Sequence, residues 1–307
     1  MRLTTFRARY GTDEACRAHL ESVRWPNGPV CDRCGSVDDA SPVAKRPGVY
    51  RCRACGKDFR VTVGTPMEDS HLPLRTWYLA MYLILASSKR ISSVKLGEQL
   101  GVGQKTAWFL GHRIRAVLDG GEKLPLSGII ETDESDIGGK AKNLRNPPGK
   151  GRGTKKPMLF AAIECGGEAR TARIGSAKID DIAPLLWRWI GGGQVVPCSD
   201  QLATYRWIGR TMEGHHAVNH ARRELVRGNW HVNTVEGFLG LFKRAIVAVW
   251  HWISSKHLHR EQVPEIAALT ASSGNGVRPY LASVELALSG VRDWVHATSS
   301  LQESRPC

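Results

Sequence analysis

Three acidic residues stand in apolar surroundings at three distant places in the sequence. Asp133 lies in SGIIETDESDIGG (127–139), Asp200 follows VVPCS, and Glu236 lies in NTVEGFLGLFK (233–243). Carboxylates drawn from distant elements supply the hard oxygen ligands that Mg²⁺ prefers, and paired ions can activate a hydroxyl and stabilise a leaving oxygen. The sequence therefore predicts a catalytic site for two Mg²⁺ or Mn²⁺ ions at Asp133, Asp200 and Glu236, suited to phosphoryl transfer.

Further acids crowd around the first of these positions. Glu131, Glu134 and Asp136 lie within three residues of Asp133. On an extended strand Glu131 and Asp133 point to one face and Glu134 to the other. Each of these three neighbours of Asp133 has an alternative interpretation as a solvated residue at the edge of a loop.

Four of the eight cysteines form two tight pairs. Cys31 and Cys34 are followed, after 17 residues, by Cys52 and Cys55. Two such pairs can surround a tetrahedral zinc ion, and four thiolates leave no position open for catalysis, so the sequence predicts a structural Zn²⁺ site. The arginines and lysines around it suit DNA phosphates, although a merely solubilising basic face is the alternative.

Residues 73–120 read as helices with one short glycine turn. Apolar periodicity predicts helices over 74–87, 91–100 and 104–118, with Gly101–Gly103 as the turn between the last two. This is a helix-turn-helix pattern, which serves either as a DNA reader or as a plain packing unit. The helix after the turn would present Gln104, Lys105, Thr106, Trp108, His112, Arg113 and Arg115, of which Lys105 and Arg113 are predicted DNA contacts.

Residues 126–260 alternate strand and helix patterns. Strands are expected over 128–134, 157–165, 168–174 and 194–197, with helices over 180–190 and from Thr234. This βββαβα order favours an RNase H-like core, a mixed sheet flanked by helices. The basic loop 140–156 contains Lys155 and Lys156 as predicted DNA contacts, or is only a charged hairpin tip. A cluster of histidines suggests phosphate contact or core hydrogen bonding ahead of a second zinc site; its members are His215, His216, His220 and His231.

The composition indicates which class of binding partner the protein has. The 307 residues carry a net charge of +14 with a pI of about 9.7, which favours a polyanion such as DNA. The longest apolar run, 77–86, is about half of a membrane-spanning helix, so no membrane partner is expected. No secretory signal is evident, and the cysteine pattern suits a reducing compartment, so we expect a cytoplasmic, nucleoid-associated bacterial protein. No nucleophile-elbow motif supports Ser-His-Asp hydrolysis.

Several stretches together resemble the IS1595-type insertion-sequence transposases of the ISXO2-like group. They are CDRCGS, YRCRACGKDFRVTVGTPME, ETDESDIGGK, GTKKPMLFAAIE, the CSD turn and HVNTVEGFLGLFKR. The resemblance implies a DDE transposase with its triad at Asp133, Asp200 and Glu236. It also implies cleavage at element ends, strand transfer into target DNA, and a dimer or larger homo-oligomer. Lys243 matches the basic residue that follows the family's glutamate, and Lys243 and Arg244 are predicted DNA contacts.

The expected organisation has four parts. They are a zinc ribbon (1–72), a helix-turn-helix region (73–120), an RNase H-like catalytic domain (126–260) and a divergent tail (261–307). After residue 260 the resemblance fails, and we hypothesise a frameshift or replaced C-terminus that would leave this copy inactive if a core-closing helix is lost. The alternatives are a DNA-binding regulator or inactive remnant without catalysis, and a nuclease or resolvase that hydrolyses without strand transfer.

Overall fold

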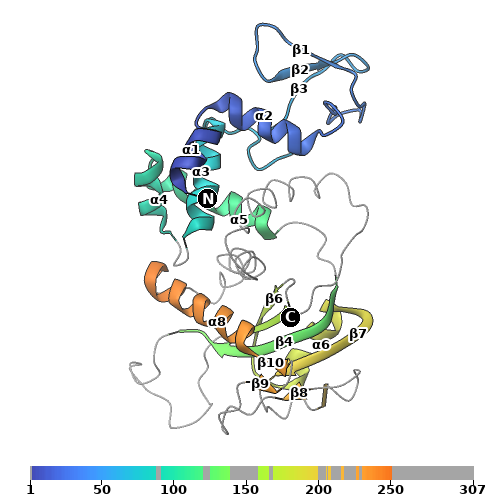
Figure 1. Ribbon diagram of the computed structural model, residues 1–307, viewed down its shortest axis with the longest axis vertical. Helices are drawn as coiled ribbons and strands as arrows, with labels where there is room; N and C mark the ends of the chain where they lie inside the picture. Colours follow the sequence, from blue (N-terminus) through green and yellow to red (C-terminus); the bar gives the residue numbers. More distant parts are fainter. Residues whose placement is uncertain are drawn as a thin grey trace. The chain divides into compact units, whose positions relative to one another are not determined.

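The computed structural model describes most of the first 250 residues. The described ranges are 2–87, 91–119, 125–138, 158–165, 169–199, 216–217, 226–227 and 230–250, together with Tyr205, Trp207 and Ile208. They divide into two compact units, one ending at Asp119 and one beginning at Pro125 (Figure 1). The predicted tail, 261–307, lies outside the described residues. Within the described part of the chain, no helix is both long and apolar enough to cross a membrane.

The first unit begins with two helices and a small antiparallel sheet. The elements are α1 (Leu3–Tyr10), α2 (Asp13–Arg24), β1 (Ala40–Pro42), β2 (Val49–Cys52) and β3 (Asp58–Arg60), with sheet order β1-β2-β3. Three helices follow: α3 (Leu74–Ala86), α4 (Ser93–Leu100) and α5 (Gln104–Asp119). One hydrophobic core includes Cys52 from the ribbon, Leu20 from α2, Trp77 from α3 and Ile114 from α5.

The predicted helices of this region are confirmed, and so is the glycine turn. Gly101 adopts the left-handed conformation at the end of α4 with φ of 67°, and the N–H of Val102 donates to the carbonyl of Gly97 at 3.0 Å. A left-handed residue with this bond ends a helix without leaving its last carbonyls unpaired. One detail was wrong: Arg115 is not presented but buried at 8% exposure, because it lies beside Ile114 at the edge of the core-facing stripe.

The second unit is built on a mixed five-stranded sheet. Its strands are β4 (Leu126–Asp136), β5 (Met158–Glu164), β6 (Ala169–Ile174), β7 (Ile190–Ser199) and β8 (His216–Ala217), in the order β6-β5-β4-β7-β8. β4, β5 and β6 are mutually antiparallel, whereas β7 runs parallel to β4 and to β8. The short strands β9 (Val226–Arg227) and β10 (Trp230–His231) form a separate pair.

Two helices cover opposite faces of this sheet. Alternate residues of β5 divide between two cores, Phe160 packing with α6 (Ile179–Trp189) and Leu159 packing with α8 (Asn233–Ala245). α8 contacts β4 and β5 and continues into a π-helical turn, η3 (Ile246–Trp250) (Figure 1). The predicted succession of three strands, a helix, a strand and a late helix is therefore confirmed, and every side chain of β4 is assigned to one face or the other by its parity.

The turn between α4 and α5 gives a stability prediction. Replacing Gly101 by Ala should lower the free energy of unfolding of the first unit by about 1 kcal/mol, because a Cβ disfavours the left-handed backbone. An added Cβ at Gly101 meets no atom within 4 Å, so no steric clash adds to this cost. Urea unfolding, monitored through hydrogen exchange of the buried amides of α3, α4 and α5, measures the change in the free energy of unfolding. Gly101→Asn is the control, since Asn tolerates this conformation and should lose less; equal losses for Ala and Asn would contradict the argument.

Candidate functional site

The acids of β4 are separated by the faces of the sheet. Glu134 points to the α6 side, where its Oε2 accepts a hydrogen bond of 2.8 Å from the hydroxyl of Tyr205, a residue of the α6-side core. Glu131 points to the α8 side, and Asp133 has the same parity. Asp136 is exposed at the end of the strand. Glu131 and Glu134 thus contact other elements on opposite faces of the sheet.

Glu131 is the most buried of these acids. Its exposure is 1%, so the interpretation of Glu131 as a solvated loop residue is wrong. Oε2 accepts hydrogen bonds from the backbone N–H groups of Thr234 at 2.8 Å and Val235 at 3.0 Å. Oε1 lies 3.1 Å from Nδ1 of His231, and neither of these two atoms has an aligned hydrogen-bond partner within the described residues. The carboxylate therefore caps the start of α8 and faces an imidazole.

Sequence reasoning missed this role of Glu131. The partners of Glu131, Thr234 and Val235, lie more than a hundred residues further along the chain, so no local pattern pointed to them. The only signal in the sequence was that Glu131 and Asp133 have the same parity on the strand. The surroundings on β7 confirm a desolvated environment: burial, and then the charge of Glu131, raise the pKa of the Cys198 thiol to about 11. A neutral thiol therefore lies beside the buried carboxylate.

Asp133 and Glu236 occur on the two elements that this contact joins. Asp133 is half-buried, and its Oδ1 accepts the N–H of Glu134 at 2.8 Å. Glu236 is exposed in the first turn of α8, beside a buried stripe. The buried stripe consists of Val235, Phe238, Leu239, Phe242 and Ile246. The basic residues Lys243 and Arg244 are exposed in the last turn of the same helix.

Several predicted site residues lie outside the described part of the chain. They are Asp200, Lys155, Lys156, His215 and His220. Asp200 directly follows Ser199, the last residue of β7. Among the described histidines, His231 lies against Glu131 without an aligned hydrogen bond, and His216 lies in β8. The described donors Asp133 and Glu236 are both carboxylates, the oxygen donor type that Mg²⁺ and Mn²⁺ take.

The four paired cysteines converge on one point in the first unit. Their Sγ atoms all lie within 4.8 Å of one another, with Cys31 and Cys55 at 3.8 Å and Cys34 and Cys52 at 3.6 Å. A tetrahedron with zinc–sulfur distances of about 2.3 Å has edges of about 3.8 Å, so the cluster fits a zinc ion.

Both pairs of cysteines use the same backbone turn. The N–H of Gly35 donates to the carbonyl of Cys31, and the N–H of Gly56 donates to that of Cys52, both at 2.9 Å. Both glycines have positive φ, 71° and 69°, which explains why glycine follows each pair. The N–H groups of the second turn, that of Cys55 first, lower the pKa of the Cys52 thiol to about 7. A thiolate is thus available for metal at neutral pH.

Comparison with known proteins finds a family match in each of the two units. Residues 125–260 match the model of the ISXO2-like transposase domain, and residues 11–58 match that of the transposase zinc-ribbon domain. The chain therefore contains an ISXO2-like transposase domain and a transposase zinc-ribbon domain of the IS1595 type. It is also 28% identical over 251 residues to an uncharacterized protein in transposable element ISH50 of Halobacterium salinarum, covering 73% of this chain and 80% of that protein.

The transposase also exposes aromatic side chains on α5, the predicted DNA-reading helix. Trp108 and Phe109 are 49% and 58% exposed, and Lys105 beside them is exposed. Arg113 is half-buried, with its guanidinium 5.8 Å from the ring centre of Phe109 and Nη1 donating to the carbonyl of Glu68 at 3.3 Å. The helix thus combines stacking surfaces with positive charge, and Phe109 was not anticipated from the sequence.

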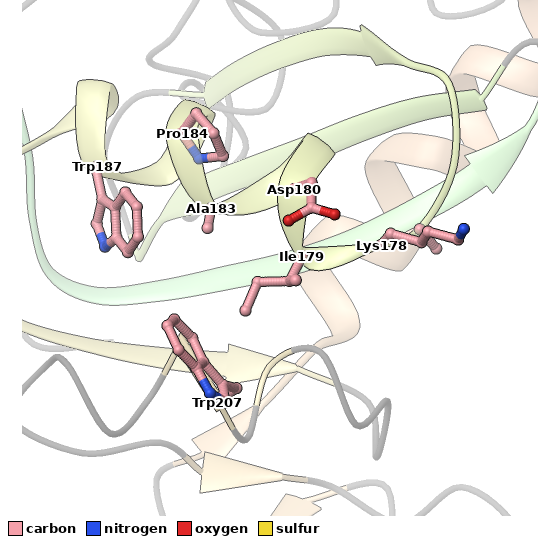
Figure 2. A pocket seen from close by; sticks show the side chains of 8 residues that line it. Lys178, Ile179, Asp180, Ala183, Pro184, Trp187 and Trp207 are labelled. Carbon is pink, nitrogen blue, oxygen red and sulfur yellow. The ribbon is translucent and has the colours of Figure 1, made fainter.

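A cavity of about 650 Å³ lies beside α6 in the second unit of the transposase. Figure 2 shows Trp187 and Trp207 on two sides of it, each about half exposed, with Lys178 and Asp180 at the start of α6. Among the described residues, its lining is mainly apolar and includes one carboxylate, that of Asp180. Because α6 covers the face of the sheet opposite α8, this cavity is separate from the Glu131–α8 contact.

The thiolate cluster predicts the outcome of removing one ligand. Cys52→Ser should abolish stoichiometric zinc binding and expose the amides of β2 and β3 to hydrogen exchange, because the metal supplies much of the ribbon's stability. Metal analysis of the purified full chain and exchange of the β2–β3 amides measure both effects.

The matched control is Cys198→Ala. This cysteine is equally buried but belongs to the sheet of the second unit. The variant should retain the zinc of the wild type. Undiminished zinc in Cys52→Ser would show that the four thiols do not form the site.

Proposed function

We propose that this transposase binds the ends of its own insertion sequence, cuts the DNA strands there and joins them to target DNA. The proposal rests chiefly on one observation: β4, which carries Asp133, is held by a buried contact to α8, which carries Glu236. The match of this same region to the ISXO2-like transposase domain supports it. DNA is therefore the proposed substrate and partner.

The proposed reaction centre is the triad Asp133, Asp200 and Glu236. When bound there, two Mg²⁺ or Mn²⁺ ions would activate water or a 3′-hydroxyl and stabilise the departing oxygen. Asp133 and Glu236 would hold the ions through carboxylate oxygens, and Asp200 is assigned from its position after β7. Lys243 and Arg244, two turns further along α8, offer positive charge to the phosphates of the bound strand.

The sheet supports an RNase H-like core as the scaffold. Three antiparallel strands, a helix and a strand parallel to the first bring β7 beside β4, with Glu131 opposite Cys198 in register. Acids on a central strand, after its parallel neighbour and on a late helix are the arrangement that such a core requires. The order β6-β5-β4-β7-β8 places β4 at the centre of the sheet.

End recognition is proposed for the first unit. The zinc ribbon exposes basic residues, among them Arg53, Lys57 and Arg60, and α4 and α5 with the Gly101 turn would act as a helix-turn-helix. Lys105 and Arg113 are the proposed contacts on α5, with Lys155 and Lys156 as proposed contacts from the basic loop. Because transposition must hold two element ends together, we propose a dimer or larger homo-oligomer on DNA.

Cleavage and strand transfer test the proposal directly. Labelled DNA with the element's own ends, incubated with the full chain and Mg²⁺ or Mn²⁺, should yield cut and joined products. Asp133→Asn, Asp200→Ala and Glu236→Gln should each lower the rate by about a thousandfold, because each removes a charged oxygen ligand. Asp136→Asn, an exposed acid on the same strand, should retain activity.

The products discriminate between the alternatives. Hydrolysis without joining would identify a nuclease or resolvase. End-specific binding without metal-dependent cleavage would identify a DNA-binding regulator or an inactive remnant.

The role of α5 predicts a salt-dependent effect. Lys105→Ala should weaken binding to the element ends and reduce the slope of log affinity against log salt by about 0.9, the loss expected for one phosphate contact. Fluorescence anisotropy over a salt series measures both. Lys95→Ala is the matched control, because Lys95 is also exposed, on α4, and pairs with Glu98 at 2.9 Å. Equal slopes for the Lys105 variant and the wild type would remove α5 from the proposed interface.

A further inference from the structure

We propose that Glu131 is a positioning residue, which sets the place of Glu236 relative to Asp133 by capping α8 from β4. The effect of Glu131 on metal binding rests on the proposed metal-dependent function. The cap of α8 by Glu131 does not, because it is present in the metal-free chain. Glu131 is not assigned as a metal ligand, because one of its oxygens accepts two N–H groups and the other faces His231.

The start of α8 depends on this carboxylate. The first turn of a helix has N–H groups without partners inside the helix. At α8 the N-cap residue is Val232, whose side chain makes no capping hydrogen bond. The N–H of Glu236 already donates to the carbonyl of Val232 at 3.0 Å, whereas the N–H groups of Thr234 and Val235 donate to Glu131. The cap therefore comes from another element.

The two hydrogen bonds to Glu131 fix both the rotation of α8 about its axis and its distance from β4. Oε2 of Glu131 is shared by two successive N–H groups, at 2.8 and 3.0 Å, immediately before Glu236. Asp133 follows Glu131 by two residues with the same parity, so the strand side of the contact includes the other acid. Glu131 is 1% exposed, hence water cannot replace it without opening the core. A shift of α8 along or around its axis would break these bonds.

Two substitutions separate length from charge. Glu131→Asp keeps the charge but withdraws the oxygens by one methylene, whereas Glu131→Gln keeps the length and an amide oxygen but loses the charge. If the cap is what matters, Gln should preserve the function of this residue and Asp should not. A site that only required negative charge would show the reverse order.

The first readout needs neither metal nor DNA. In the full chain without divalent ions, hydrogen exchange of the Thr234 and Val235 amides should accelerate by about tenfold in Glu131→Asp and much less in Glu131→Gln. Glu134→Gln is the control: it changes a carboxylate on the same strand that bonds to Tyr205 on the opposite face, and should leave these two amides protected. Unchanged exchange in Glu131→Asp would overturn the cap.

The second readout is the affinity for Mn²⁺ alone, measured by electron paramagnetic resonance. Glu131→Asp should weaken it by about tenfold or more, the usual effect of losing a group that orients a ligand, and Glu131→Gln should stay close to wild type. Weakening in Glu131→Gln with wild-type affinity in Glu131→Asp would assign the effect to charge, and equal weakening in both would show that the cap does not account for it; either result would overturn the positioning role. If the wild type binds no Mn²⁺, the positioning role fails with the proposed metal site, while the exchange data still decide the cap.

Discussion

The second unit depends on one buried carboxylate shared between a strand and a helix. Glu131 satisfies two N–H groups at the start of α8 and lies against His231, in a position with almost no access to solvent. Leaving a buried polar group without its hydrogen bonds costs about 1–3 kcal/mol, and more for a charged group, so the strand and the helix are expected to keep this arrangement. Asp133 and Glu236 are next to this contact on the strand and the helix, so the contact sets their relative positions.

Strand parity explains why one short sequence can serve both faces of the sheet. Within β4, Glu131 contacts α8 and Glu134 contacts Tyr205 in the α6-side core, so two carboxylates three residues apart brace opposite layers. Parity could be predicted from the sequence, because it follows from the extended backbone. The partners could not, since nothing local in ETDES distinguishes a residue that is buried against a helix from one that is solvated.

Local signals predicted much of the rest. The cysteine spacing encodes its own geometry, because each pair and its following glycine form one turn, and the four Sγ atoms converge as expected. The α3–α5 helices and the Gly101 turn likewise follow from short-range periodicity. Arg115 shows where this prediction fails. Hydrophobicity identifies the residues in the middle of a buried stripe, but whether a residue at its edge is buried depends on the neighbouring helices. Asp200 lies outside the described residues, and its assignment rests on its place after the apolar segment VVPCS.

The helices are capped in two ways, either by a residue next to the helix or by a side chain of another element, and only the second way also positions the helix. Thr12 and Ser92 cap α2 and α4 from within, each accepting an N–H at 3.2 Å, which stabilises the helix but connects it to nothing else. α3 is capped from outside, by Asp13 of α2 through the N–H of Arg75 at 2.9 Å, so an exposed carboxylate holds two helices together. α8 uses the same chemistry in a buried form. A polar residue at position 232 would cap α8 locally without connecting it to β4. With Val232 at that position, the hydrogen bonds to Glu131 join the start of α8 to the strand that carries Asp133, in addition to the packing of the apolar stripe.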